Sequence, residues 1–156
     1  TPAKLGVGRN GAGAVRNVGM AHVTTPWVAF VDDDDTLSPT YVAALRQNIS
    51  RHPQLPAMIF RMVHHGGNVL PPAEHSMFQP CAVGISFAVH MDLWRAHQLA
   101  FVPSAMEDYA LLCSIHALTD MLLAPQVTYF VRNQRARQDV TYPERVIARS
   151  LPSGSA

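Results

Sequence analysis

The sequence is poor in charged residues, which make up 15% of its 156 residues and leave a formal net charge of +1. Without an excess of either sign, the composition does not favour nucleic acid or an anionic membrane as a partner, and we expect no nucleic-acid binding. Hydrophobic residues, at 48%, are frequent enough to build a core. The length is typical of one globular domain.

Cysteine is also scarce, and no segment is typical of export or membrane insertion. Cys81 and Cys113 are too far apart for a Cys-x-x-Cys motif, and two cysteines are too few for a disulfide framework. The best apolar run, residues 110–117, is interrupted and too short to span a bilayer. No positively charged start precedes an apolar run. We expect a cytoplasmic protein, at most peripheral to a membrane.

Hydrophobic periodicity switches repeatedly between helical and strand patterns. Ser38 is expected to cap a helix with Pro39 at its first position. The alternation predicts an α/β layered domain over residues 1–150, followed by a small, polar, flexible tail over 151–156. The predicted helices cover residues 12–22, 40–50 and 107–120, and the predicted strands cover 28–31, 57–65 and 127–131. Residues 66–80 are expected to form a loop rich in Gly and Pro, and residues 81–98 a strand that leads into a short helix.

Four consecutive carboxylates, Asp32 to Asp35, follow the first predicted strand. Crowded carboxylates raise one another's pKa unless a cation neutralises them, and ligands of α/β sheets gather at the carboxyl ends of strands. Mg²⁺ or Mn²⁺ takes one or two such ligands together with waters and phosphates. In an extended chain, Asp32 and Asp34 point to the same side. The alternative is a solvated loop whose acids favour the start of the next helix; the spacing does not fit a calcium loop.

A second acidic pair, Glu107-Asp108, opens the predicted helix 107–120. One of these carboxylates could act as a general base that takes a proton from an attacking hydroxyl. The alternative is that both merely complement the helix dipole. The residues alone leave both interpretations open.

Basic and glycine-rich segments offer possible phosphate contacts. Arg132, Arg135 and Arg137 follow the last predicted strand, where guanidinium groups could clamp a diphosphate or form a solvated tail. The glycine stretch 6–11 lacks the strand of a dinucleotide fingerprint and the Gly-Lys-Ser/Thr of a Walker loop. Arg9 and Arg16 could face a phosphate near the start of the helix that follows this stretch. The alternative is that the glycines serve only as flexible turns.

The remaining residue types support few other chemistries. The histidines show no zinc spacing, and His65 or His75 is the only candidate for an extra metal ligand. No Gly-x-Ser-x-Gly is present and neither cysteine has an evident partner, so nucleophilic catalysis has little support.

The motifs taken in order resemble the signature of family 2 glycosyltransferases. The stretch "NGAGAVRNVGMAHVTTPWVAFVDDDDTLSPTYV" matches Asn-x-Gly-x-x-x-Ala-Arg-Asn-x-Gly followed by an apolar strand, Phe-Leu-Asp-x-Asp-Asp and a Pro. "GISFAVHMDLW" is similar to the acceptor-side strand and helix of that family, "EDYALL" to its Glu-Asp helix and "TYFVRNQR" to its closing Tyr-x-x-Arg segment. The resemblance covers residues 5–137.

This resemblance implies a GT-A type fold and an inverting transfer of sugar from a nucleotide-diphosphate donor to a saccharide or lipid-linked acceptor. It implies Asp34 and Asp32 as the DxD element that holds Mn²⁺ or Mg²⁺, with Asp32 nearer the donor ribose or the water shell of the metal. Asp108 would be the base and Glu107 the neighbouring candidate. The implied donor-binding residues are Arg16, Asn17, Asp32, Asp33, Arg132 and Arg135.

The sequence departs from the family pattern in two places. The first half of the family's domain, which normally binds the nucleotide base, does not precede Thr1. We therefore expect a trimmed or incomplete domain, with a missing N-terminal half or a second copy in a homo-oligomer as its partner. Asn133 and Gln134 stand where the family usually has a His. A nucleotidyltransferase of similar fold and a non-catalytic module that binds a cation or a partner are the alternative functions.

Overall fold

The computed structural model describes residues 11–135 and 140–151. Arg9, Arg137 and most of the predicted tail lie outside the described residues. The helices are α1 (Ala12–Met20), α2 (Tyr41–Arg51), α3 (Met91–Ala96) and α4 (Glu107–His116), with short 3-10 turns η2 (His65–Gly67) and η3 (Val131–Asn133). The strands are β1 (Trp27–Ala29), β2 (Thr36–Leu37), β3 (Ala57–Val63), β4 (Val69–Leu70), β5 (Phe87–His90), β6 (Met121–Phe130) and β7 (Arg145–Ile147).

The strands form one mixed sheet in the order β1-β5-β3-β6-β2, with β4 paired to β3 and β7 to β6. Only β3 and β6 pair in parallel, with Met58 opposite Leu122; the other pairs are antiparallel. Because β1 and β3 both run antiparallel to β5, the carboxyl ends of β1, β3 and β6 lie at the same edge of the sheet. That edge carries the candidate site.

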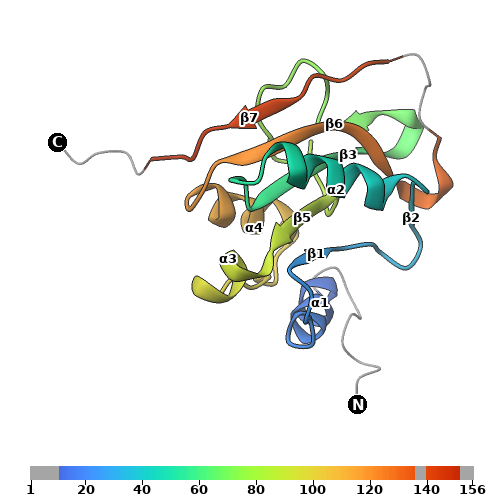
Figure 1. The fold of residues 1–156 in the computed structure, drawn as a ribbon. Helices are drawn as coiled ribbons and strands as arrows, with labels where there is room; N and C mark the ends of the chain where they lie inside the picture. The colour runs from blue at the N-terminus through green and yellow to red at the C-terminus, as the bar shows by residue number, and fades with distance from the viewer. Residues whose placement is uncertain (1–10, 136–139, 152–156) are drawn as a thin grey trace.

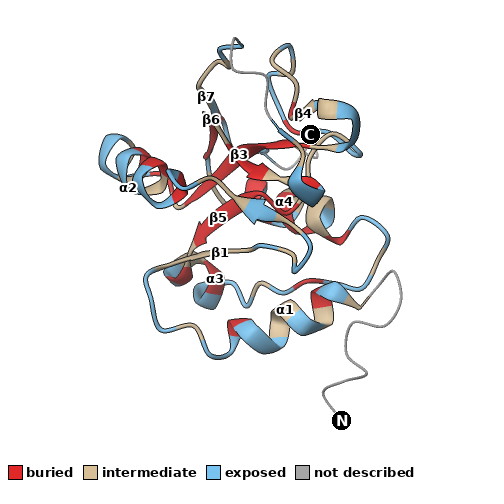
Figure 2. Ribbon diagram, turned by 90° about the vertical axis from the view of Figure 1, so that its right-hand side faces the viewer, coloured by how far each residue is buried: buried red, intermediate tan, exposed pale blue. Residues whose placement is uncertain are grey.

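Helices cover both faces of the sheet (Figure 1) because successive strand residues point to opposite sides. Met58 and Phe60 of β3 pack with Tyr41 of α2 on one face. Ala57 and Ile59 belong to the larger core on the other face, which α3 and α4 cover. Figure 2 shows the buried residues concentrated along the central strands, while the outer sides of the helices are exposed. Within the described part of the chain, no helix is long and apolar enough to cross a membrane.

The second helix begins later than the sequence pattern predicts. The Ser38 hydroxyl accepts the Thr40 N–H at 3.2 Å, and its carbonyl accepts the Tyr41 N–H at 2.9 Å. Ser38 therefore closes a turn before the helix, and Pro39 lies in that turn. The buried side of α2 carries Tyr41, Ala44 and Asn48, whereas Val42 is 58% exposed.

The last long strand differs from the sequence prediction for another reason. β6 begins at Met121, six residues before the predicted start at residue 127, and contains Pro125. Its pairing with β3 shifts register between Ile59 and Arg61, so that Arg61 lies opposite Val127 while Ile59 lies opposite Leu123. Proline has no N–H to donate to a strand ladder, and a position where the ladder is interrupted accommodates it. Strand β7 was not predicted.

Candidate functional site

Carboxylates from distant parts of the chain line one cavity of about 480 Å³, called the acidic cavity here. Asp32, Asp34 and Asp35 lie on the turn that follows β1, and Asp108 lies in the first turn of α4. The rest of the wall comes from the ends of β3 and β6, from η2 and β4, and from the loop before β5: Met62, His64, His65, Leu70, Cys81, Val83, Gly84, Ile85, Val131 and Arg132. The cavity lies at the edge where three strands end, as expected for α/β ligand sites.

The four aspartates form a turn and not an extended segment. Strand β1 ends at Ala29, and the Asp35 N–H donates to the Asp32 carbonyl at 3.1 Å. The predicted alternation, with Asp32 and Asp34 on one side, is therefore wrong in its geometry. Each carboxylate has a different environment because the turn rotates successive side chains in different directions.

Arg16 on α1 connects this turn to the start of α4. Its guanidinium donates to Asp32 Oδ1 at 2.5 Å, to Glu107 Oε1 at 3.0 Å and to Asp108 Oδ1 at 3.2 Å. It also lies over the Phe101 ring, 5.3 Å from the centroid. The Arg16 side chain is only 12% exposed, so these charge-assisted contacts are poorly screened. One arginine thus connects the two predicted acidic motifs.

Two other residues hold α1 against the segment before α4. The Asn17 amide donates to the Phe101 carbonyl and accepts the Phe101 N–H, both at 2.8 Å. A Cβ on Gly13 would collide with Glu107 Oε2 and lie 2.9 Å from Phe101 Cβ. Close approach of α1 therefore requires glycine here. The predicted donor-binding role of Asn17 stays a prediction; its amide is engaged with backbone.

Asp35 is held by the end of β6. The Tyr129 hydroxyl donates to Asp35 Oδ2 at 2.6 Å and accepts the Asp32 N–H at 3.1 Å. The Arg132 N–H donates to Asp35 Oδ1 at 3.0 Å. Tyr129 is fully buried, and burial together with the bond to Asp35 raises the pKa of its hydroxyl. The hydroxyl stays protonated and fixes the turn. Tyr129 was part of the Tyr-x-x-Arg resemblance, but the sequence assigned it no role.

Asp108 is the carboxylate whose protonation is most altered by its surroundings. Burial raises its pKa, the Arg16 guanidinium lowers it, and the negative charges of Glu107 and Asp32 raise it further, to about 6. Glu107 is more deeply buried, and its Oε2 atom has no hydrogen-bond partner among the described residues. Of the two predicted catalytic acids, Asp108 is the one that lines the acidic cavity.

The residues present fit a hard divalent cation that is only partly held by protein. In the described ranges, no group of three His, Cys, Asp or Glu side chains is arranged to hold a metal ion. Asp34 lines the cavity and its side chain is 57% exposed; among the described residues its one ion pair is with Arg132 Nε, at 3.3 Å. Mg²⁺ and Mn²⁺ accept such sparse carboxylate ligation when waters and phosphate oxygens complete the octahedron. The predicted metal role of Asp34 and Asp32 stays a prediction.

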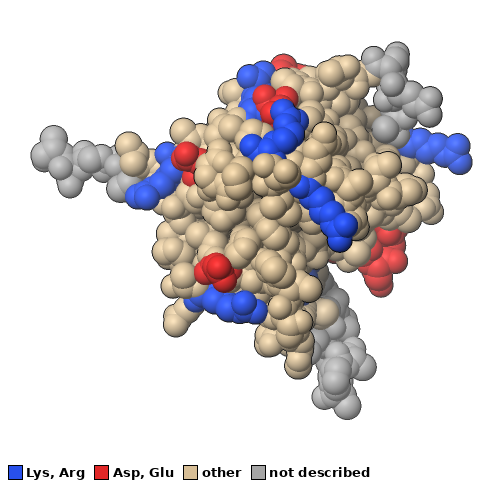
Figure 3. All heavy atoms as spheres, in the orientation of Figure 1, with Lys and Arg blue, Asp and Glu red and all other residues tan. Residues whose placement is uncertain are grey.

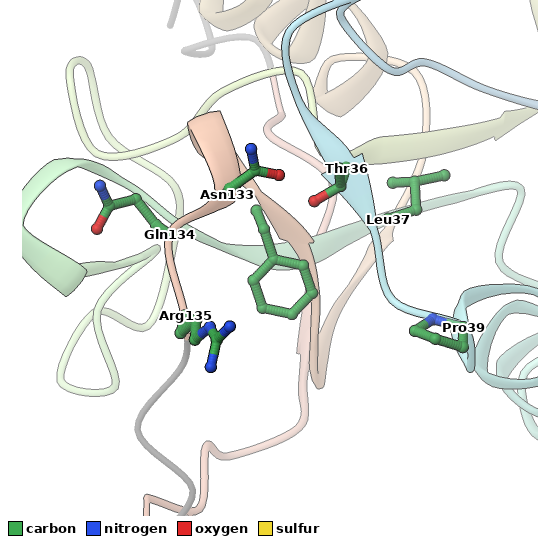
Figure 4. Close-up of a pocket in the computed structure, with 7 residues that line it drawn as sticks. Thr36, Leu37, Pro39, Asn133, Gln134 and Arg135 are labelled. Carbon is green, nitrogen blue, oxygen red and sulfur yellow. The ribbon is translucent and has the colours of Figure 1, made fainter.

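The other predicted donor ligands lie in three different surroundings. Asp33 is exposed. Arg132 lines the acidic cavity beside Asp34. Arg135 lines a neighbouring hollow of about 580 Å³, called the second pocket, together with Thr36, Leu37, Pro39, Phe130, Asn133 and Gln134 (Figure 4). The second pocket is the larger of the two, but none of the described residues that line it is a carboxylate, so the acidic cavity is the stronger candidate for catalysis.

Sequence reasoning missed part of the cavity wall. His65 was considered only as an extra metal ligand, and His64 and Cys81 had no assigned role, yet all three line the acidic cavity. Burial and the neighbouring His65 lower the pKa of His64, while Asp35 raises it. No local pattern distinguishes these residues, because β3 and the loop before β5 bring them together only in the fold. On the face shown in Figure 3, the arginines of the described residues are scattered among few acids.

The fold is similar to that of S. aureus TarS. TarS 1–349 in complex with UDP-GlcNAc aligns with a TM-score of 0.63 and 17% identity over 82% of this chain and 40% of that chain. TarS 1–349 aligns with a TM-score of 0.61 and 16% identity over 81% of this chain and 42% of that chain. At this identity the likeness is one of fold, and this chain spans about two fifths of the TarS 1–349 chain.

The sequence comparisons are consistent with that fold. No curated protein matches the sequence significantly. The family described as glycosyl transferase family 2 matches residues 5–106, which is well over half of the 156 residues. The match includes Arg16 and the four aspartates, and the predicted GT-A type mixed α/β fold is confirmed. The chain therefore belongs to glycosyl transferase family 2.

Proposed function

We propose that this chain is the catalytic part of an inverting glycosyltransferase that moves a sugar from a nucleotide-diphosphate donor to an acceptor hydroxyl with Mn²⁺ or Mg²⁺. The observation that carries the proposal is the arrangement of the acidic cavity. Asp34 of the turn and Asp108 of α4 line the same hollow, and Arg16 connects the two elements. A donor and an acceptor could therefore meet between them.

Asp108 is the proposed general base. Its Oδ1 atom lies 3.2 Å from Arg16 Nη1. The side chain is 29% exposed and lines the acidic cavity. A pKa of about 6 leaves it ionised at neutral pH while keeping it basic enough to accept a proton from a hydroxyl as that hydroxyl attacks. A single base acting on the acceptor, with direct displacement of the diphosphate, corresponds to inversion at the sugar carbon.

The donor is proposed to bind along the aspartate turn. Asp34, with Asp32 nearby, would hold the cation, and Arg132 lies beside it to contact phosphate oxygens. The cation, when bound, neutralises the negative charge that develops on the leaving diphosphate. UDP-GlcNAc bound to the structurally similar TarS supports a nucleotide sugar as the donor class. Donor contacts by Arg16 and Asn17 belong to the same proposal, whereas Asp33 is exposed and Arg135 lines the second pocket.

The fixed position of the turn supports this arrangement. Asp32 is held by Arg16, and Asp35 is held by both the Tyr129 hydroxyl and the Arg132 N–H. Asp34 lies between these two anchored positions. Its carboxylate is thereby presented to the cavity without depending on a preformed cage of protein ligands, which suits a cation that arrives with the donor.

Isothermal titration calorimetry tests donor binding. The protein is titrated with UDP-, GDP- and dTDP-sugars in the presence of Mn²⁺ and again in the presence of EDTA. The proposal requires cation-dependent binding of at least one nucleotide sugar. Absence of binding to all of them, in both conditions, would contradict it.

The variant Asp108→Asn tests the role of the base. It should bind the donor as the wild type does, yet lose donor hydrolysis and sugar transfer. Loss of donor binding together with turnover, or loss of neither, would contradict this role. Cation-dependent binding with no turnover by the wild type would instead favour a non-catalytic module, and release of pyrophosphate from an NTP and a sugar phosphate would favour a nucleotidyltransferase.

A further inference from the structure

One short segment of the chain contributes to both the second pocket and the acidic cavity. Val131 and Arg132 line the acidic cavity, and the next three residues, Asn133 to Arg135, line the second pocket. The backbone turns sharply between them, with positive φ angles of 46° at Arg132 and 61° at Asn133. Neighbouring residues of one short segment therefore contribute to two adjacent hollows.

The lining of the second pocket has a distinct chemistry. Phe130, Leu37 and Pro39 contribute apolar surface, while Thr36, Asn133, Gln134 and Arg135 contribute a hydroxyl, two amides and a guanidinium. Figure 4 shows Thr36 and Leu37 on one side of the hollow and Asn133, Gln134 and Arg135 on the other. No carboxylate, histidine or cysteine is among the described residues that line it. Metal binding and acid–base catalysis are therefore poor matches.

A sugar ring matches this lining because it combines apolar C–H faces with a rim of hydroxyl groups. An aromatic side chain and proline can pack against the C–H face. Amide, hydroxyl and guanidinium groups can donate to or accept from the ring hydroxyls, and a few such polar groups set in an apolar wall are typical of small-molecule sites. The volume of about 580 Å³ is sufficient for one or two sugar units.

We propose that the second pocket binds a sugar unit of the acceptor saccharide, beyond the unit whose hydroxyl reacts in the acidic cavity. The inference rests on the proposed function, because it assigns the acceptor of the same transfer reaction to the saccharide class. It places the recognition of the acceptor on β2 and the end of β6, away from the cation and the base.

The spacing between the two hollows is held by the structure. Thr36 pairs with Phe130 between β2 and β6. On the side of the acidic cavity, Asp35 is bonded to Tyr129 and to the Arg132 N–H. A fixed spacing favours an acceptor long enough to occupy both hollows at once, because the second contact is then intramolecular. Oligosaccharides should therefore bind more tightly than monosaccharides.

The test is an NMR titration of the ¹⁵N-labelled full chain with a fixed set of sugars. The set contains the methyl glycosides of glucose, mannose and N-acetylglucosamine, and the tetrasaccharides maltotetraose, mannotetraose and chitotetraose. At least one tetrasaccharide should shift the amide signals of residues 36–37 and 130–135. Shifts confined to the acidic cavity, or no shift in these two segments with any of the sugars, would overturn the proposal.

Two variants and one matched control connect binding to the pocket. Arg135→Ala should raise the Kd for the tetrasaccharide roughly tenfold, and Thr36→Val, which removes only the hydroxyl, roughly fivefold. Arg46→Ala removes another exposed arginine, on the outer side of α2, and should leave the Kd unchanged. An equal effect of Arg46→Ala and Arg135→Ala would overturn the proposal, since it would indicate a general charge effect.

Donor binding is followed in the same samples through the signals of residues 32–35, with Mg²⁺ and UDP-, GDP- and dTDP-sugars. If a donor binds but the sugars do not reach the second pocket, the inference fails and the proposed function stands. If the sugars bind in the second pocket but no donor binds, the chain is a saccharide-binding module and the proposed function fails. The two failures are thus distinguished.

Discussion

Arg16 and Asp108 are 92 positions apart in the sequence, yet the Arg16 guanidinium donates to the Asp108 carboxylate at 3.2 Å. The same guanidinium bonds Asp32 on the aspartate turn. The contact therefore aligns the proposed base with the proposed donor site and moderates the pKa of that base.

The pH dependence of transfer should report Asp108. A base must be ionised to accept a proton, so kcat/KM should rise with pH and level off above the pKa of about 6. Below that pKa the rate should fall about tenfold for each pH unit. The measurement is kcat/KM between pH 4.5 and pH 8 at saturating Mn²⁺. A profile that is flat across this range would contradict the assignment.

The stability of the protein should depend on the same group. The folded-state pKa of Asp108 is raised from 3.8 to about 6, so the unfolded chain loses its proton first as pH rises. The contribution of Asp108 to the free energy of unfolding is therefore fully present below about pH 4. It falls as the pH rises to about 6 and stays lower above that pH. Asp108→Asn should remove this loss and stabilise the protein at pH 7 by about 3 kcal/mol at most. Urea unfolding at pH 4 and pH 7 measures the difference, and an unchanged pH dependence in the variant would contradict the raised pKa.

Replacing Arg16 should affect both stability and the pH profile. Arg16→Met leaves Glu107 and Asp108 without their cationic partner, and loss of one member of a largely buried ion cluster costs about 3 kcal/mol. Because Arg16 lowers the pKa of Asp108, the rising part of the kcat/KM profile should move to higher pH. Arg46→Met, on the exposed side of α2, is the control and should change neither quantity.

Two glycines of α1 should respond in opposite ways to alanine. In a helix, Gly→Ala normally stabilises by about 0.5–1 kcal/mol. Gly19 has open space around it, so Gly19→Ala should follow that rule. At Gly13 the new Cβ would collide with Glu107 Oε2 and with Phe101, and overpacking of this kind costs about 1–3 kcal/mol. Thermal or urea unfolding of the two variants provides the comparison; equal effects would contradict the close contact between α1 and α4.

The aspartates of the turn should not be equivalent in donor binding. Asp34 lines the acidic cavity, whereas Asp33 is exposed and does not line it. Asp34→Ala should weaken Mn²⁺-dependent binding of the nucleotide sugar by roughly 100-fold, because a metal ligand is lost. Asp33→Ala removes the same charge one residue away and should have little effect. Calorimetry distinguishes them, and a larger effect at Asp33 would reverse the assignment.

Several features could be predicted from sequence because they depend on neighbours along the chain. The helices expected over residues 12–22, 40–50 and 107–120 and the strand expected over 57–65 match α1, α2, α4 and β3 within a few residues. Glu107-Asp108 was expected at a helix start and does lie in the first turn of α4. The start of β6 was missed, because the register of β6 against β3 decides it. The expected helix cap at Ser38 was also wrong, because its bonds close a turn that holds Pro39 before the helix.

The sequence by itself determined the family, the alternation of strands and helices, and which acidic and basic residues are available, because these follow from residue type and spacing. Only the tertiary structure decided how those residues are used. It folded Asp32 to Asp35 into a turn and brought Arg16 between Asp32 and Asp108. It also placed Arg135 in the second pocket and not in the acidic cavity. The physical reason is that a carboxylate's pKa and partners depend on burial and on charges a few ångströms away, and these come from segments that are distant along the chain.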